Sequence, residues 1–161
     1  MIRHLLISGP LLLVLSSTTF AQETAAAPEG TVRAATIMAA ESQEYGRYLV
    51  DGESRTVYLF TADSQGQNDA EAAASNCHDA CAEAWPPVLT QGDPMAGEAV
   101  VQDLLGSIVR RDGAMQVTYN GWPLYYYVQD QGAGETTGQD IESFGGEWYL
   151  VRPEGEKLGH E

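Results

Sequence analysis

Residues 57–63 read VYLFTAD and residues 124–130 read LYYYVQD, and the pattern that they share decides the fold. In each stretch a tyrosine follows an apolar residue, an aromatic residue follows two places later, and an aspartate ends the pattern. Each stretch follows an Asp-Gly pair, leads into a Gly-containing acidic loop and then reaches a tryptophan, Trp85 or Trp148. Such self-similarity indicates tandem copies of one supersecondary unit. We therefore expect two repeats that share a single core.

The runs around these stretches are typical of β-strands. They are rich in β-branched and aromatic residues, and turn pairs such as Asn120-Gly121 separate them. Pro123 stands at the start of the strand with the second motif, where a missing backbone N–H is tolerated. The expected strands lie at Thr31–Met38, 48–50, 56–61, 108–111, 115–119, 124–128 and 147–152.

Two regions between the strands lack this pattern. Residues 69–84 are rich in alanine and acidic residues and predict a short helix, which Pro86-Pro87 would end. Residues 132–146 are rich in glycine and acids and predict a surface loop. The sequence thus predicts a mainly β fold, in which two tandem hairpin-based repeats share one core and one short helix lies near the cysteine pair.

The N-terminal residues are typical of an export signal. Arg3 and His4 precede an apolar run at 5–15, and small residues then lead to a cleavage site after Ala21. The apolar run is shorter than the ~20 residues that span a bilayer. We therefore expect a mature chain without a transmembrane segment, which is periplasmic or secreted.

These signals predict the organisation of the whole chain. The length of 161 residues supports one doubled domain of ordinary size. The expected parts are a signal peptide at 1–21, an N-terminal tether with a first strand at 22–44, a two-repeat domain at 45–153 with halves of about 45–90 and 107–153, and a polar, frayed tail at 154–161.

The charge of the chain restricts its partners. Twenty-three acidic residues face eight lysines and arginines, which gives a formal net charge of −15. Nucleic acid and anionic lipid would be repelled by such a chain, so we expect neither as a partner. The acidic surface serves solubility, or else it attracts cations or a basic envelope protein.

The motifs also resemble those of a known family. The chain is similar to the bacterial secreted or lipoprotein-type domains that carry a repeated Tyr-x-(Phe/Trp/Tyr)-x-x-Asp motif and are described as a secreted repeat of unknown function. The matching residues are Tyr58, Phe60 and Asp63; Tyr125, Tyr127 and Asp130; the Cys77-x-x-x-Cys81-Ala-x-x-Trp85-Pro86-Pro87 block; Arg111-Asp-Gly113; Gln116-Val-Thr-Tyr119; Gly121-x-Pro-Leu-Tyr125; and Gly146-x-Trp148-Tyr149.

The resemblance covers roughly residues 46–153 and has two departures. Many relatives carry a lipidated cysteine, which this chain lacks, and residues 67–76 are longer than the usual approach to the first cysteine. The family brings no established activity, so the resemblance implies an exported repeat domain and leaves its chemistry open.

The motif residues allow two interpretations. Side chains alternate along a strand, so Tyr58 and Phe60 share one face, as do Tyr125 and Tyr127, while Tyr126 faces the other way. Asp63 and Asp130 then lie at strand ends, where a carboxylate can accept backbone N–H bonds and fix a turn. Alternatively, the two carboxylates and nearby loop acids hold a hard cation such as calcium, although neither loop has the DxDxDG spacing.

Cys77 and Cys81 are the only cysteines. A close pair in an exported protein favours a disulfide, and since residues i and i+4 of a regular helix are too far apart for one, a bridge implies that the helix is distorted or ends there. The alternative is a copper or zinc site, or a redox thiol pair, that uses Cys77, His78 and Cys81.

Conventional catalytic patterns are missing from the sequence. After export only His78 and His160 remain as histidines, and there is no GxSxG nucleophile motif or glycine-rich phosphate loop. We therefore predict a non-enzymatic binding or interaction domain without a cofactor, and a metal- or redox-accessory protein is the alternative. The candidate binding residues are Tyr58, Phe60, Asp63, Tyr125, Tyr127, Asp130 and Trp122, of which we expect Trp122 to be exposed.

Overall fold

A hairpin followed by a motif strand forms the first half of the fold. The computed structural model describes residues 33–66 and 73–159, all within one unit of the chain. Strands β1 (Thr36–Ser42) and β2 (Gly46–Asp51) pair antiparallel, and a turn at Asp51 leads to β3 (Tyr58–Phe60). The first strand thus forms, but further along the chain than Thr31–Met38. The signal peptide and residues 22–32 of the tether lie outside the described residues.

The second half repeats this plan. Strands β5 (Leu105–Val109) and β6 (Met115–Tyr119) form an antiparallel hairpin, and the Asn120-Gly121 turn leads to β7 (Trp122–Pro123) just before the second motif. Both residues of this turn have positive φ angles, 48° and 76°. Such angles are required at both central residues of a type I′ turn, for which Asn-Gly is the favoured pair. The predicted hairpin of 108–111 with 115–119 and the turn at Asn120-Gly121 are confirmed. Two predictions are corrected: residues 48–50 and 56–61 share only the bridge between Val50 and Thr56, and the strand expected at 124–128 is reduced to isolated bridges at Tyr125, because β7 ends at Pro123.

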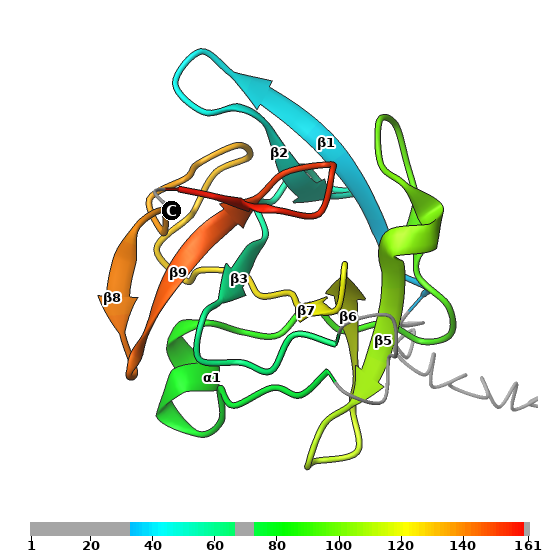
Figure 1. Ribbon diagram of the computed structural model, residues 1–161, viewed down its shortest axis with the longest axis vertical. Helices are drawn as coiled ribbons and strands as arrows, with labels where there is room; N and C mark the ends of the chain where they lie inside the picture. The colour runs from blue at the N-terminus through cyan, green and yellow to red at the C-terminus, as the bar shows by residue number, and fades with distance from the viewer. Residues whose placement is uncertain (1–32, 67–72, 160–161) are drawn as a thin grey trace, which may run out of the picture. The chain divides into compact units, whose positions relative to one another are not determined.

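The last long strand of the chain forms the centre of a third sheet (Figure 1). Strand β9 (Gly146–Val151) pairs with β3, β8 (Ile141–Ser143) and β10 (Lys157–Leu158). Two predictions are corrected here. The loop expected at 132–146 gives way to β8, and the tail is not frayed up to Leu158, because that side chain is 7% exposed and packs in the core.

Helical structure is shorter than the alanine-rich composition predicts. The helix α1 spans Ala80–Ala84, and residues 73–79 are not helical. The other part of the predicted helix, residues 69–72, lies outside the described residues. A bond between Cys77 and Cys81 explains the late start, since a regular helical turn would hold the two cysteines too far apart. A 3-10 helix at Gln102–Leu104 precedes β5, and β4 (Met95–Ala96) pairs parallel with β1.

The two repeats exchange strands. β3 of the first repeat pairs with β9 of the second, so that Phe60 lies opposite Trp148. In return, the second motif pairs with residues 86–88 of the first repeat: Tyr126 N–H donates to Pro86 O at 2.8 Å, and Val88 N–H donates to the carbonyl of Leu124. Each repeat therefore completes the sheet of the other.

The two motif segments also meet directly. Tyr58 and Tyr125 exchange both backbone hydrogen bonds, at 2.8 and 2.9 Å, which places them side by side and antiparallel. The loop after each motif also bonds to the turn before the motif of the other repeat. Gly66 N–H donates to Gly121 O, and Gly134 N–H donates to Ser54 O. The halves are thus related by an approximate two-fold exchange at the two tyrosines.

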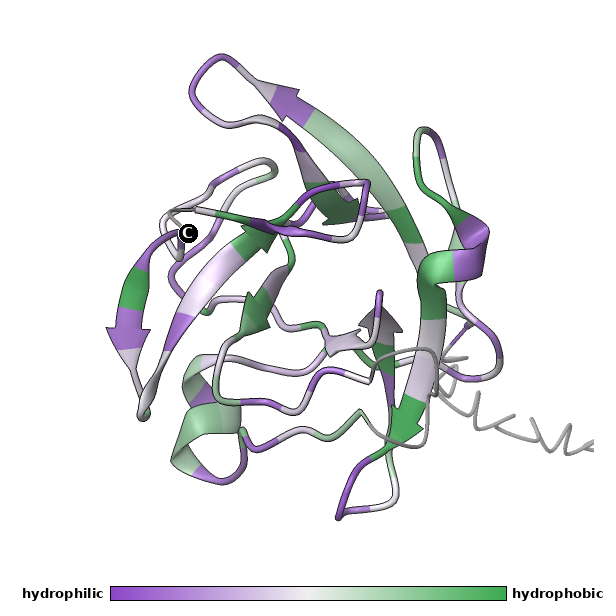
Figure 2. Ribbon diagram, viewed as in Figure 1, coloured by the Kyte–Doolittle hydropathy of each residue, from purple (hydrophilic) through white to green (hydrophobic). Residues whose placement is uncertain are grey.

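Two apolar clusters fill the space between the sheets. Figure 2 shows apolar segments on the strands, while the turns that end the β1–β2 and β5–β6 hairpins are hydrophilic. Alternation along the motif strands assigns their side chains: Tyr58 and Phe60 enter one cluster, and Val57 and Leu59 enter the other. The described residues form a mainly β fold of two repeats with a short helix near the cysteines, as the sequence predicts.

Candidate functional site

The motif tyrosines and aspartates pair across the repeats. The Tyr58 hydroxyl donates to Asp130 Oδ2 at 2.6 Å. Reciprocally, the Tyr125 hydroxyl donates to Asp63 Oδ2 at 2.6 Å. Both tyrosines are fully buried, and hydrogen bonds to a carboxylate are among the stronger ones in proteins. The repeated motif therefore joins the two halves.

The second oxygen of each carboxylate fixes the chain that follows. Asp63 Oδ1 accepts the backbone N–H of Asn76 at 2.7 Å, and Asp130 Oδ1 accepts the N–H and the hydroxyl of Thr137. These contacts match the turn-fixing interpretation. Within the described ranges, no three His, Cys, Asp or Glu side chains form a group that could hold a metal ion.

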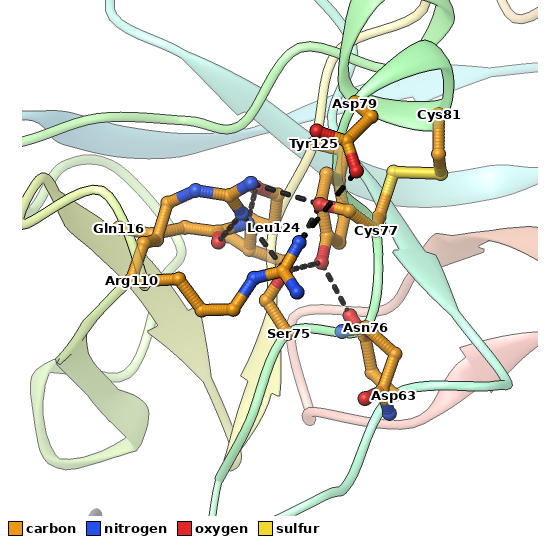
Figure 3. The surroundings of a disulfide bond; sticks show 11 residues. Asp63, Ser75, Asn76, Cys77, Asp79, Cys81, Arg110, Gln116, Leu124 and Tyr125 are labelled. Atoms are coloured by element: carbon orange, nitrogen blue, oxygen red, sulfur yellow. Dashed lines mark hydrogen bonds and ion pairs between the residues drawn. A yellow bond between two sulfur atoms is a disulfide. The ribbon is translucent and has the colours of Figure 1, made fainter.

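Asp63 belongs to a buried polar chain (Figure 3). Arg110 Nη1 donates to Ser75 Oγ at 2.8 Å, and Ser75 Oγ lies 2.8 Å from the Tyr125 hydroxyl. Because the single Tyr125 proton is directed to Asp63, the serine hydroxyl donates to the phenol oxygen. Burial raises the pKa of Asp63 to about 6, although Tyr125, Asn76 and the Arg110 charge oppose this rise.

Arg110 is a polar residue that the sequence did not reveal as buried. Its side chain is 2% exposed, and its guanidinium donates to Gln116 Oε1 at 2.6 Å and to Cys77 O at 2.8 Å. Gln116 in turn donates to the Leu124 carbonyl. These bonds tie the second hairpin to the cysteine segment of the first repeat. The available signal was strand alternation, which places Arg110 on the same face as buried Ile108.

Cys77 and Cys81 form a disulfide, with Cα atoms 5.2 Å apart, so the predicted bridge is present. The alternative interpretation of Cys77, His78 and Cys81 as a copper or zinc site, or as a redox thiol pair, requires thiolates. In the disulfide form neither cysteine is a thiolate that could bind copper or zinc. The redox alternative stays a prediction, because a disulfide is the oxidised form of such a thiol pair.

The aromatic residues of the motifs form a continuous ring stack. Trp85 and Trp148 stack at 3.9 Å between ring centroids, with Tyr127 against Trp85 at 4.0 Å and Phe60 against Trp148 at 4.1 Å. Each tryptophan also meets a motif tyrosine edge-on, since Tyr58 contacts Trp85 and Tyr125 contacts Trp148. Of the motif aromatic residues, only Tyr127 is half-buried and within reach of a ligand.

Trp122 does not stand free at the surface. It is half-buried and packs against the cluster that contains Val57 and Leu59, so the expectation of an exposed ring was wrong. The reason is the strand exchange, which brings β7 onto the core of the other half instead of leaving the Asn120-Gly121 turn isolated.

A cavity of about 230 Å³ opens beside the second motif. It is the place where two of the predicted binding residues, Tyr127 and Asp130, reach a surface. Their companions Tyr58, Phe60, Asp63 and Tyr125 are enclosed in the core. The complete lining consists of Arg55, Thr56, Pro86, Tyr126, Tyr127, Val128, Asp130 and Gly132.

One wall of this cavity is a clamped arginine. Arg55 Nε donates to Asp51 Oδ2 at 2.8 Å, and its guanidinium carbon lies 4.1 Å from the centroid of the Tyr126 ring. The Tyr126 hydroxyl donates to the same Asp51 oxygen at 2.9 Å and accepts from Arg55 Nη2 at 3.1 Å. Burial and then the Asp51 charge raise the pKa of Tyr126, so its hydroxyl keeps its proton. The guanidinium is held in one orientation beside the cavity.

The two repeats differ at this point. Arg55 precedes its motif tyrosine by the same distance as Trp122 precedes the second one, and Tyr126 corresponds to Leu59. Tyr58, Phe60 and Asp63 correspond to residues of the same kind in the second copy, whereas these two pairs differ in kind. This difference is visible in the sequence, but the prediction of binding residues used only the positions that the two repeats share.

A second cavity of about 290 Å³ lies beside the disulfide-bonded segment, lined by His78, Asp79, Ala82, Arg110, Arg111 and Asp112. Its ion pairs are loose, with Arg111 Nη2 3.7 Å from Asp79 and Arg110 Nε 3.8 Å from Asp112. Burial and the two arginines lower the pKa of His78. Positive and negative groups both line the opening, so it does not favour an ion of one sign.

The fold and the site define a disulfide-containing β domain built from two repeats that exchange strands. Comparison with protein families finds a match at residues 40–89 and 106–152 to the family described as a secreted repeat of unknown function. These segments cover more than half of the chain, so the chain belongs to this family, and it is an exported protein. No curated protein and no solved structure matches the chain. Among residues 33–66 and 73–159, no helix is long and apolar enough to cross a membrane.

Proposed function

We propose that the protein is a non-enzymatic binding domain of the cell envelope or the extracellular medium, and that its ligand site is the cavity beside Arg55, Tyr126, Tyr127 and Asp130. One observation carries this proposal. Arg55 is held by buried Asp51 and stacked on Tyr126, although the corresponding position in the other repeat holds a tryptophan that packs in the core. Fixing an exposed cation at a cavity edge prepares it for a ligand.

The repeated pattern of the motif itself has another role. The polar groups of its buried members form hydrogen bonds between the two repeats: Tyr58 donates to Asp130, and Tyr125 donates to Asp63. Binding therefore falls to residues that surround the second motif rather than to the motif as a whole. Asp130 belongs to both groups, because it anchors Tyr58 and also lines the cavity.

The groups in the cavity favour binding over catalysis. A general base needs a free lone pair within reach of the proton that it takes. Asp51 accepts from Arg55 and Tyr126, and Asp130 accepts from Tyr58 and Thr137. The acceptor sites of Asp51 are filled and the hydroxyl of Tyr126 is protonated, which leaves Asp130 with one acceptor site that can hold a ligand hydroxyl.

A fragment screen by amide NMR tests the proposal. Fragments that bind should shift amide signals of Tyr126 to Gly132, and Arg55→Ala should weaken them at least tenfold. Arg47→Ala is the matched control, because Arg47 is also half-exposed and ion-paired, with Glu154 at 3.4 Å, yet does not line the cavity. The proposal fails if no fragment shifts these amides, or if Arg55→Ala and Arg47→Ala behave alike.

A further inference from the structure

Charges of both signs lie at the cavity. Arg55 contributes a positive charge, which pairs with Asp51 Oδ2 at 2.7 Å and with Glu53 Oε2 at 3.5 Å, and Asp130 contributes a negative charge to the lining. An anionic ligand would meet the Asp130 carboxylate, and a cationic ligand would meet the guanidinium. Either kind of ligand would lose hydration of its charge without gaining an opposite charge that is free to pair with it. The cavity therefore selects a neutral ligand.

Hydrogen-bonding capacity is left on both sides. Arg55 donates through Nε and Nη2, but within the described part of the chain its Nη1 has no hydrogen-bond partner. Asp130 accepts three hydrogen bonds, from Tyr58 and twice from Thr137, and a carboxylate has about four acceptor sites. A ligand must thus accept from a guanidinium and donate to a carboxylate. A hydroxyl group does both.

The cavity also has an apolar wall. Tyr127 is held by its stack on Trp85, and Pro86 and Val128 complete this wall. The volume of about 230 Å³ is below the ~300–1,000 Å³ of sites for drug-sized ligands, so it suits a single ring. A rigid ring that carries several hydroxyls and presents a face of C–H groups combines all of these requirements.

We propose that this cavity binds one neutral saccharide ring. The C–H face of the ring packs on Tyr127 and Pro86, and neighbouring hydroxyls accept from Arg55 Nη1 and donate to Asp130. This inference rests on the proposed function and adds the class of ligand. An arginine suits this contact better than a lysine would, because its planar guanidinium can donate to two adjacent oxygens at once, whereas a lysine ammonium acts as a point charge.

Amide NMR titration with simple sugars tests this class. Neutral probes are glucose, galactose and N-acetylglucosamine, and the matched charged probes are glucuronate and glucosamine. At least one neutral sugar should shift the amides of Tyr127 to Gly132, and its charged counterpart should bind at least fivefold more weakly. Arg55→Lys should weaken the neutral sugar at least fivefold, whereas Arg47→Ala should leave its affinity unchanged within twofold.

Each outcome decides between the two proposals. If fragments bind at the cavity but no neutral sugar does, or if the charged sugars bind more tightly, the saccharide assignment is overturned and the binding function stands. If neither fragments nor sugars shift the cavity amides, both proposals fail. If Arg55→Lys binds the neutral sugar as wild type does, the proposed hydroxyl contacts are wrong.

Discussion

The hydroxyl of Tyr58 donates a 2.6 Å hydrogen bond to the carboxylate of Asp130, which lies 72 residues further along the chain in the other repeat. The second tyrosine of the pattern, Tyr125, makes the corresponding bond to Asp63 of the first repeat. Each copy of the motif therefore supplies half of two interactions. One repeat alone would leave the hydroxyl of its motif tyrosine and the carboxylate of its motif aspartate without these partners. The two repeats are therefore expected to fold as one unit.

The turn at Gly121 should be intolerant of a side chain. Gly121→Ala places a methyl group at a φ of 76° and against the carbonyl oxygen of Gly66, which packs on this turn. Gly113→Ala is the matched control, because Gly113 has a φ of 84° but nothing within 4 Å of an added Cβ. We expect a loss of about 1 kcal/mol for the control and at least twice that for Gly121→Ala, by urea unfolding. Equal losses would contradict the loop contact.

Loss of a stacked tryptophan should cost far more than loss of Trp122. Trp148 is fully buried between Phe60 and Trp85, so Trp148→Ala should lower the free energy of unfolding by about 3–5 kcal/mol. Trp122 is half-buried at the edge of its cluster, and Trp122→Ala should cost about 1–2 kcal/mol. Chemical unfolding followed by circular dichroism measures both. A larger loss at Trp122 would show that the ring stack is not the main support of the core.

The stability should depend on pH through Asp63. Because burial raises the pKa of Asp63 to about 6, the folded state keeps a proton that the unfolded state has already lost between about pH 4 and pH 6. Wild-type stability should therefore fall relative to Asp63→Asn as the pH rises through this window, by up to about 3 kcal/mol, and level off above it. Urea unfolding of both proteins at several pH values gives the difference. A difference that is constant, or that rises with pH, would contradict the shift.

The disulfide should shape the chain locally rather than hold the fold. Its loop is short, and the chain-entropy relation gives about 2 kcal/mol of stabilisation for such a loop. Reduction should lower the free energy of unfolding by this amount while the protein stays folded, and a Cys77→Ser/Cys81→Ser variant should not respond to the reductant. Global unfolding on reduction would mean that the Arg110 contact to the Cys77 carbonyl depends on the bond more strongly than we expect.

Much of the fold could be predicted because its signals are local. The turn pairs, the alternation of Tyr58 and Phe60, and the repeated aspartates all follow from spacing along the chain. The exchange between repeats could not be predicted, since a pattern that occurs twice does not say which copy of Asp pairs with which copy of Tyr. The late start of the helix in the alanine-rich region was missed because the disulfide overrides helix propensity there.

The candidate site was predicted only in part. Tyr127 and Asp130 were found through the motif, but Arg55, Asp51 and Tyr126 were not. Asp51 sits in an Asp-Gly pair that reads as turn chemistry, and Arg55 follows it in the same connection. Their partnership with Tyr126 depends on contacts over more than 70 residues of chain, which only the strand exchange creates.

The exchange itself is tested most directly by two double-mutant cycles measured by urea unfolding. The first cycle combines Tyr58→Phe with Asp130→Asn, and the second combines Tyr58→Phe with Asp63→Asn from the same copy of the motif. The exchanged arrangement predicts a coupling energy of about 1.5–3 kcal/mol for Tyr58 with Asp130 and less than about 0.5 kcal/mol for Tyr58 with Asp63. Coupling of Tyr58 to Asp63 instead, or to neither aspartate, would contradict it.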